Sequence, residues 1–147
     1  QLKIEDRLNE SLKRLKRHKE PFSIIAFDLD GFKPINDNYG HATGDLLLKR
    51  FVKLITSSYR DTDTFARLGG DEFALILPNV CAEELEISCK KILEVLSKAQ
   101  RINVINIEIQ CSIGGVSVTY EQLAKTHKRE LLKRADDAIY LAKKVSG

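Results

Sequence analysis

Two β-prone runs flank a Gly-Gly pair in Thr64-Phe65-Ala66-Arg67-Leu68-Gly69-Gly70-Asp71-Glu72-Phe73-Ala74-Leu75-Ile76-Leu77. Such a pair is typical of a tight hairpin, because primed turns need positive φ at their central residues. We therefore expect Asp71 and Glu72 at the hairpin tip. Paired acids beside glycines have no role in a core, whereas hard divalent ions prefer such oxygen ligands, with nucleotide phosphates completing the shell.

A second set of carboxylates follows an apolar run upstream. The run Phe22 to Phe27 predicts a buried strand, and it ends in Asp28-Leu29-Asp30. Both sets of acids thus lie where predicted strands end. This arrangement predicts a metal-nucleotide site.

Helical and strand periods alternate along the rest of the chain without a linker or repeat. Helical stripes are formed by Ile4, Leu8, Leu12 and Leu15, by Leu47, Phe51, Leu54 and Ile55 in a helix starting near Ala42, by Leu85, Cys89, Ile92, Leu93 and Leu96, and by Ala135, Ala138, Ile139 and Ala142. Ile105, Ile107, Ile109, Cys111 and Ile113 alternate with polar residues, which predicts a half-buried strand.

Composition limits the class of protein. At 147 residues, 43% hydrophobic and 31% charged, the chain has the size of one globular domain. A net charge of +3 is too small to indicate nucleic acid or a membrane surface as a partner. The three cysteines lack metal spacing and are interpreted as buried thiols in a reducing compartment. No bilayer-spanning run or signal peptide is visible, so we expect a cytoplasmic location for this piece.

An ordered set of motifs carries a family resemblance. The set comprises the segment from Ile24 to His41, Gly44-Asp45, Gly69-Gly70-Asp71-Glu72-Phe73, Ser112-Ile113-Gly114, and the segment from Ala135 to Lys143. In this order it resembles the GGDEF family of diguanylate cyclases over nearly the whole chain, 1–147, taken as a single catalytic domain. The resemblance implies condensation of two GTP molecules into cyclic di-GMP and two pyrophosphates.

The element order contains β-α-β-β-α-β, the ferredoxin-like split unit, so the predicted class is α+β with an antiparallel central sheet and flanking helices. The resemblance likewise implies the palm-type fold shared by nucleotide cyclases and polymerases. This topology places the first strand beside the hairpin. Asp28 is then expected to meet Asp71 and Glu72 at one edge of the sheet.

The resemblance implies a metal site for Mg²⁺ or Mn²⁺, with two ions per active site. Asp28 and Asp71 would be the carboxylate ligands and the Leu29 carbonyl an extra ligand. Glu72 would be either a further ligand or the group that assists deprotonation of the attacking hydroxyl. Asp71, Glu72 and Lys33 form the expected catalytic set.

Phosphate binding is expected at the turn that follows Asp30. The backbone amides of Gly31, Phe32 and Lys33 can point together at the β- and γ-phosphates, and Lys33 adds charge. Lys143 matches the family's second phosphate-binding lysine. The family's usual arginine, one turn further on, has no counterpart because the sequence ends at Gly147.

Asn36 and Asp45 match the family's guanine-binding pair. A carboxylate accepts from guanine N1–H and the 2-amino group, while an amide donates to ring acceptors. His41 either contacts the base or makes a structural hydrogen bond. Asp30 and Asp37 are interpreted as local caps or ion-pair partners.

Arg60 and Asp63 fit the family's Arg-x-x-Asp product-inhibition site, where a guanidinium can fork onto guanine or phosphate. The alternative is a surface ion pair. The resemblance also implies a catalytic homodimer and a sensory or dimerising domain elsewhere in a full-length protein, which could be membrane-anchored. The sequence begins inside the family's first helix, so we interpret it as an excised catalytic fragment. The alternative function is a catalytically silent module that binds cyclic di-GMP or GTP as an effector.

Overall fold

The structure is a computed structural model that describes residues 4–30, 32–98, 100–102, 105–107, 109–121 and 133. Its elements follow in the order α1 (Ile4–His18), β1 (Phe22–Asp30), α2 (Phe32–Tyr39), α3 (His41–Thr56), β2 (Thr64–Gly69), β3 (Glu72–Pro78), α4 (Ala82–Leu96), β4 (Gln100–Ile102), β5 (Ile105–Ile107) and β6 (Gln110–Val118). Among the helices of these residues, none combines the length and the apolar character needed to cross a membrane.

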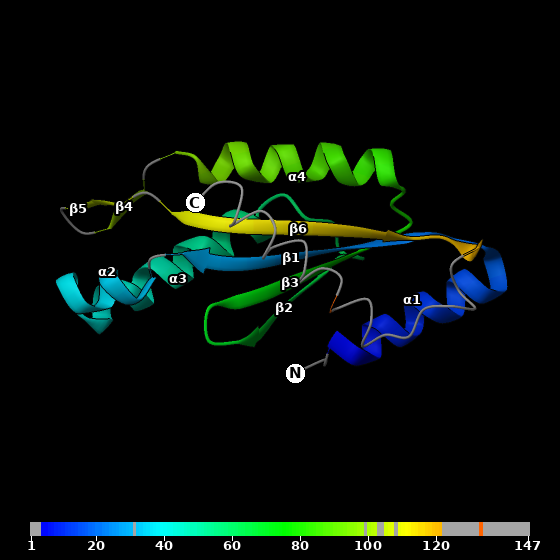
Figure 1. The fold of residues 1–147 in the computed structure, drawn as a ribbon, viewed down its shortest axis with the longest axis horizontal. Coiled ribbons are helices and arrows are strands. Elements are labelled where there is room, and N and C mark those ends of the chain that lie inside the picture. The colour runs from blue at the N-terminus through cyan, green and yellow to red at the C-terminus, as the bar shows by residue number, and fades with distance from the viewer. Residues whose placement is uncertain are drawn as a thin grey trace.

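The central sheet has four antiparallel strands in the order β2-β3-β1-β6. β1 lies between β3 and β6 and pairs with β3 from Phe22↔Pro78 to Asp28↔Glu72. The predicted α+β class and the placement of the first strand beside the hairpin are confirmed. In Figure 1 the β2–β3 turn and the end of β1 lie at the same end of the sheet.

Helices cover both faces of β1, which explains its unbroken apolar run. Successive strand residues point to opposite faces, so Ile25 and Phe27 enter the core shared with α3 and α4, while Phe22 and Ile24 pack against α1. Figure 1 shows α4 running along one side of the sheet and α1 on the other. The sheet is therefore a middle layer with a hydrophobic core on each face.

An aromatic cluster joins the hairpin to α3. Phe65 and Phe73, on neighbouring strands, stack with ring centroids 5.5 Å apart. Phe51 of α3 meets Phe73 at 5.1 Å and Phe27 of β1 at 5.8 Å. Such ring pairs add to the burial of their area and fix relative orientation. The cluster sets the position of the hairpin against the first strand.

The predicted helical stripes are confirmed within the described residues. Leu8 and Leu15 of α1 are fully buried, as are Phe51 of α3 and, nearly so, Leu85 of α4. Leu93 is 46% exposed, because a helix resting on one face of a sheet buries a single stripe and this residue lies at its margin. The predicted last helix, with its stripe from Ala135 to Ala142, lies outside the described residues.

Two sequence expectations need correction. The alternating segment from Ile105 to Ile113 is not one strand: β5 pairs with β4 in a separate two-stranded sheet, and β6 begins at Gln110. Alternation reports a half-buried extended chain but not its pairing partner, so it does not separate one strand from two. The second correction concerns the thiols, which are free but only partly buried: Cys81, Cys89 and Cys111.

Candidate functional site

β1 and β3 bring their acidic residues together at one end of the sheet. Asp28 lies opposite Glu72 in the β1–β3 ladder and opposite Ser112 in the β1–β6 ladder. Opposed residues of an antiparallel pair share a face, with Cβ atoms about 4.5–5.5 Å apart. Asp28 is partly buried and Glu72 is exposed. The predicted meeting of the two acidic sets is confirmed.

The hairpin turn consists of Gly70 and Asp71, because Gly69 pairs with Glu72. Gly70 has φ +51°, the left-handed region that a residue with a Cβ rarely adopts. The register shifts between Arg67 and Gly69, so one extra residue forms a bulge before the turn. Gly70 thus has the positive φ expected of a turn glycine, whereas Gly69 ends β2 without one. The central turn residues are Gly70 and Asp71 rather than the Gly-Gly pair, and Glu72 begins β3.

A backbone hydrogen bond ties this turn to β1. The Leu29 N–H donates to the Asp71 carbonyl at 3.0 Å. Leu29 follows Asp28 directly, so the bond places the Asp71 backbone beside the end of β1. Asp28, Leu29 and Asp71, three of the four residues expected at the metal site, are thereby adjacent.

Ser112 is a residue of this region to which the sequence assigned no role. Its hydroxyl donates to an Asp30 carboxylate oxygen at 2.7 Å, and Ser112 is 7% exposed. The two residues are 82 positions apart in the chain. This bond gives Asp30 a structural role, but one that joins β1 to β6 rather than the local cap or ion pair expected from the sequence.

The acids at this end of the sheet are oxygen donors, the kind that Mg²⁺ and Mn²⁺ prefer. Within the described part of the chain, no three His, Cys, Asp or Glu side chains are grouped so as to hold a metal by themselves. Mg²⁺ is usually bound through one or two carboxylates plus substrate phosphates rather than in an all-protein cage. Asp28 and Asp71, with the neighbouring Leu29 carbonyl, fit an ion shared with a nucleotide.

The expected phosphate-binding turn leads into α2, which begins at Phe32. Lys33 is exposed in the first turn of this helix, at the end of the sheet that carries Asp28. A helix N-terminus offers unpaired amides to anions. Gly31 and Lys143 lie outside the described residues, as does the side chain of Phe32.

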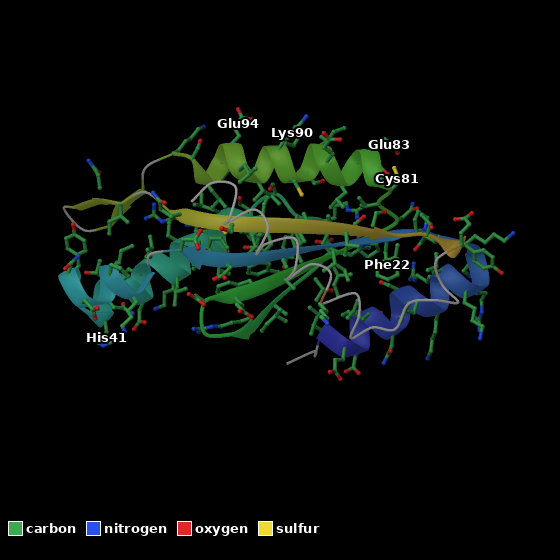
Figure 2. The ribbon with its side chains drawn as sticks, viewed as in Figure 1. Phe22, His41, Cys81, Glu83, Lys90 and Glu94 are labelled. Atoms are coloured by element: carbon green, nitrogen blue, oxygen red, sulfur yellow. The ribbon has the colours of Figure 1, made fainter. Side chains whose placement is uncertain are left out.

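The expected guanine residues come from two consecutive helices. Asn36 lies in α2 and Asp45 in the first turns of α3, with Gly40 at φ +91° between the helices. The Asn36 Oδ1 atom is buried and has no hydrogen-bond partner within the described chain. An unpaired buried acceptor is costly and calls for a partner. His41 is exposed and lies at the outer end of these helices (Figure 2).

A groove of about 560 Å³ runs between α3 and the hairpin. It begins at Asp45, and Arg67 and Phe73 form part of its hairpin side. The volume is within the range of small-molecule sites, roughly 300–1,000 Å³. The groove connects an expected base-binding residue with the hairpin that carries Asp71.

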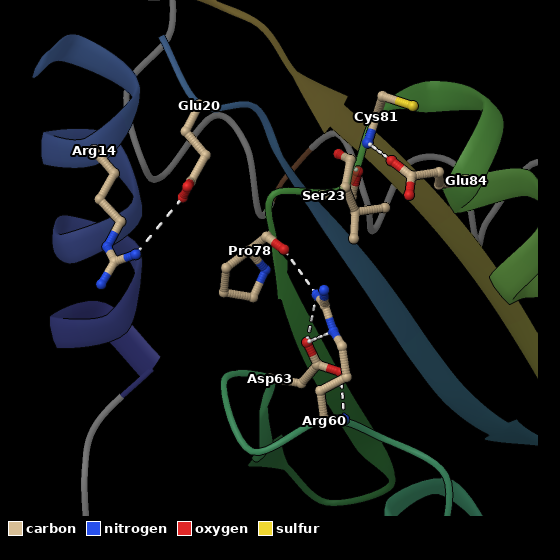
Figure 3. A network of polar contacts seen from close by, with 9 residues as sticks. Arg14, Glu20, Ser23, Arg60, Asp63, Pro78, Cys81 and Glu84 are labelled. Atoms are coloured by element: carbon tan, nitrogen blue, oxygen red, sulfur yellow. Dashed lines mark hydrogen bonds and ion pairs between the residues drawn. The ribbon is translucent and has the colours of Figure 1, made fainter. Parts of the chain in front are cut away.

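Arg60 and Asp63 form a closed ion pair (Figure 3). One Asp63 oxygen accepts from Arg60 Nε at 3.1 Å and from Nη2 at 2.9 Å, and the other accepts from the Arg60 backbone N–H at 2.8 Å. Arg60 Nη2 also donates to the Pro78 carbonyl at 2.7 Å. The Asp63 side chain is 3% exposed, against 51% for Arg60.

This ion pair lies at the end of β3 opposite the hairpin turn. β3 runs from Glu72 to Pro78, so the two ends are roughly 20 Å apart at about 3.3 Å per residue. Beside the pair is a cavity of about 320 Å³ bounded by α3, α4 and the sheet. Glu84 lines it, and a hydrogen bond with Cys81 holds the pKa of Glu84 below its ordinary value, with the Arg60 charge acting in the same direction.

Comparisons with known proteins all point to one family. The family model described as diguanylate cyclase, GGDEF domain, matches residues 1–147. The bifunctional diguanylate cyclase/cyclic di-GMP phosphodiesterase MucR of Pseudomonas aeruginosa is 36% identical over 140 residues, covering 95% of this chain and 20% of that protein. Diguanylate cyclase A of Treponema denticola is 39% identical over 127 residues, covering 85% of this chain and 33% of that protein.

A solved structure supports the fold. The GGDEF domain of DgcB from Caulobacter crescentus, in complex with cyclic di-GMP, superposes with a TM-score of 0.84 at 26% identity. The match covers 97% of this chain and 83% of that one. The chain thus spans a third or less of the two curated relatives but most of a single solved domain.

Proposed function

The chain belongs to the diguanylate cyclase family defined by the GGDEF domain, and from this premise we propose that it condenses two GTP molecules into cyclic di-GMP and two pyrophosphates. The observation that carries the proposal is the cross-strand pairing of Asp28 with Glu72, beside a turn that presents Asp71. Each 3′-oxygen forms a bond to the other nucleotide's α-phosphorus. The bond from that phosphorus to pyrophosphate breaks, and each attacking hydroxyl loses its proton.

Asp28, Asp71 and the Leu29 carbonyl would hold the Mg²⁺ or Mn²⁺ ions, two per active site. When bound, the metal supplies charge neutralisation at the α-phosphate, acidifies the hydroxyl and stabilises the departing pyrophosphate. Glu72 is exposed and in register with Asp28. It acts as a further ligand or as the acceptor of the hydroxyl proton, two roles that the same position permits.

The nucleotide is held by residues on α2 and α3. The amides of Gly31, Phe32 and Lys33, with the Lys33 ammonium, bind the β- and γ-phosphates, and Lys143 adds a second charge. Asp45 accepts from the guanine N–H donors. Asn36 and His41 complete the base pocket, and the unpaired Asn36 Oδ1 atom supports a polar ligand there. Adenine lacks the donor pattern that Asp45 requires.

Two copies of the domain must face each other during catalysis. The product is two-fold symmetric, and one site with one GTP supplies only half of the reaction. A homodimer is therefore part of the proposal. A sensory or dimerising domain in the full-length protein would control how the copies meet.

Product inhibition at Arg60 and Asp63 is also proposed. The solved DgcB domain, a structural neighbour, is in complex with cyclic di-GMP. In the present chain Asp63 is already fully engaged by Arg60. The Arg60 side chain is 51% exposed, so cyclic di-GMP can reach the guanidinium while the ion pair with Asp63 is in place.

The test is incubation of concentrated protein with GTP and Mg²⁺ or Mn²⁺, with detection of cyclic di-GMP by mass. Asp71→Ala should abolish product formation while leaving the fold intact, because Asp71 occupies a partly exposed turn position outside the core. Glu94→Ala, which removes an exposed acid on α4, is the matched control (Figure 2). Product from Asp71→Ala at the parent rate would contradict the metal assignment. If calorimetry shows that the unsubstituted protein binds cyclic di-GMP or GTP but it makes no product, the protein is instead a catalytically silent, effector-binding module.

A further inference from the structure

Arg67 is hydrogen-bonded to the hairpin turn that contains Asp71. It lies on β2, and its Nε and Nη2 atoms both donate to the Gly70 carbonyl, at 2.8 and 2.5 Å. Its guanidinium carbon lies 5.9 Å from the centroid of the Phe73 ring, a cation–π distance. Phe73 is 3% exposed and belongs to the aromatic cluster. The guanidinium thus links the exposed turn to a fixed part of the core.

Two successive carbonyls of the turn therefore each accept a hydrogen bond, one from β2 and the other from β1. Arg67 holds the Gly70 carbonyl, and the Leu29 N–H holds the Asp71 carbonyl at 3.0 Å. Each carbonyl fixes the plane of its own peptide unit, because the peptide bond is planar. The two planes flank the Asp71 Cα atom. When both planes are fixed, φ and ψ of Asp71 are fixed as well. The direction in which its Cβ leaves the backbone is then determined.

We propose that Arg67 is a positioning residue for Asp71: it clamps the Gly70 peptide so that the Asp71 carboxylate is held toward Asp28 for the metal-dependent step. The expected effects on activity and on metal affinity rest on the proposed function, whereas the hydrogen bonding of Arg67 to the turn does not. Catalytic groups must be placed within about half an ångström of productive geometry, and a misplacement of about 1 Å can cost roughly 100-fold in rate. A two-residue turn with a flexible glycine does not supply that precision by itself.

The arginine side chain suits this task better than lysine. Its planar fork sends two N–H groups to one carbonyl and stacks on an aromatic face, whereas an ammonium is a compact, strongly hydrated charge. Arg67 also lines the groove that contains Asp45. A direct contact between Arg67 and GTP is the competing explanation, and the two predict different kinetics.

The experiment compares Arg67→Ala and Arg67→Lys with the parent. Arg14→Ala is the matched control, because Arg14 is an exposed guanidinium on α1 whose contact with Glu20 is 3.9 Å long. Three quantities are measured: kcat and KM for GTP, Mn²⁺ affinity in the presence of α,β-methylene GTP, and amide order parameters of Gly70 and Asp71 by ¹⁵N relaxation.

For Arg67→Ala we expect kcat to fall about 10- to 100-fold with KM within about threefold, because orientation is lost rather than substrate contact. Mn²⁺ affinity should fall about tenfold. The order parameters of Gly70 and Asp71 should drop from about 0.85 to below about 0.6. Arg67→Lys should recover less than a third of the lost kcat, and Arg14→Ala should match the parent in all three measurements.

Parent-like kcat in Arg67→Lys would overturn the clamp, since charge alone would then suffice. A raised KM at unchanged kcat would assign Arg67 to substrate binding instead. Unchanged order parameters in Arg67→Ala would also overturn it. If the parent itself makes no cyclic di-GMP and binds no Mn²⁺, the proposed function fails, and the order parameters still decide whether Arg67 holds the turn.

Discussion

Replacing Arg60 by alanine should destabilise the domain as well as relieve product inhibition. Asp63 is 3% exposed, and the substitution removes the two guanidinium donors from its carboxylate, leaving the Arg60 backbone N–H. Breaking a fully buried ion pair costs about 3–5 kcal/mol. Because the Arg60 side chain is 51% exposed, water can partly replace it, so we expect a loss of about 1–3 kcal/mol. For a chain of this length, that corresponds to a fall in Tm of roughly 3–10 °C.

The assay is a double-mutant cycle by thermal and urea unfolding. It uses the parent, Arg60→Ala, Asp63→Ala and the double variant, and we expect the two single losses to exceed the double loss by about 1 kcal/mol. The Arg14 and Glu20 pair is the internal control. It is 3.9 Å long, and the Arg14 side chain is 63% exposed, so its coupling should be close to zero.

Additive effects in the Arg60–Asp63 cycle would refute the reasoning, because independent side chains cannot form the closed pair described. Calorimetry of cyclic di-GMP adds a second criterion. Arg60→Ala should lose tenfold or more in affinity, the equivalent of one charge-assisted contact of about 1.5–3 kcal/mol. Equal binding by the variant and the parent would leave the pair as a structural feature alone.

Three other outcomes follow from the site and the turn. Asp45→Ala should raise the GTP concentration required for activity and weaken discrimination against ATP, by about 1–3 kcal/mol, and unchanged GTP affinity would place the base pocket elsewhere. Initial rates should rise more steeply than linearly with protein concentration while light scattering shows a mostly monomeric sample. A rate strictly proportional to the concentration of monomer would contradict the proposal that two domains each supply half of the reaction. Gly70→Ala should lower the free energy of unfolding by about 1–2 kcal/mol through its φ of +51°, while Gly69→Ala should be close to neutral in urea unfolding, since an added Cβ meets nothing within 4 Å at either position.

Local chemistry explains why the hairpin and the meeting of the acidic residues could be predicted. The Gly69-Gly70 pair between β-prone runs indicates a turn, which Gly70 forms through its positive φ, and the strand order then places β1 beside β3. Asp28 and Glu72 face each other as a consequence of this topology. Information carried within a few residues was sufficient for these features.

Contacts between distant residues could not be predicted in this way. The bond from Ser112 to Asp30 joins positions 82 apart, and that from Arg60 to the Pro78 carbonyl joins positions 18 apart. The hydrogen bond from Arg67 to the Gly70 carbonyl joins residues close in sequence. It nevertheless depends on the bulge in β2 and on the position of the Phe73 ring, both of which are set by the folded structure. The division of the segment from Ile105 to Ile113 into two strands likewise depends on a contact outside the segment, the pairing of β5 with β4.

The position of Arg60 also restricts how product bound there could act on the turn at Asp71. Arg60 contacts the last residue of β3, and Asp71 precedes the first. Between them, Phe73 to Leu77 are all buried and paired with β1, and Phe73 to Ile76 are paired with β2 as well. A strand held this way does not slide gradually, because a shift of one residue would move every side chain to the opposite face. Close packing likewise favours discrete states over continuous deformation. Inhibition from Arg60 is therefore expected to work by fixing one domain against another, so that two GTP-loaded ends do not meet, rather than by transmission along β3.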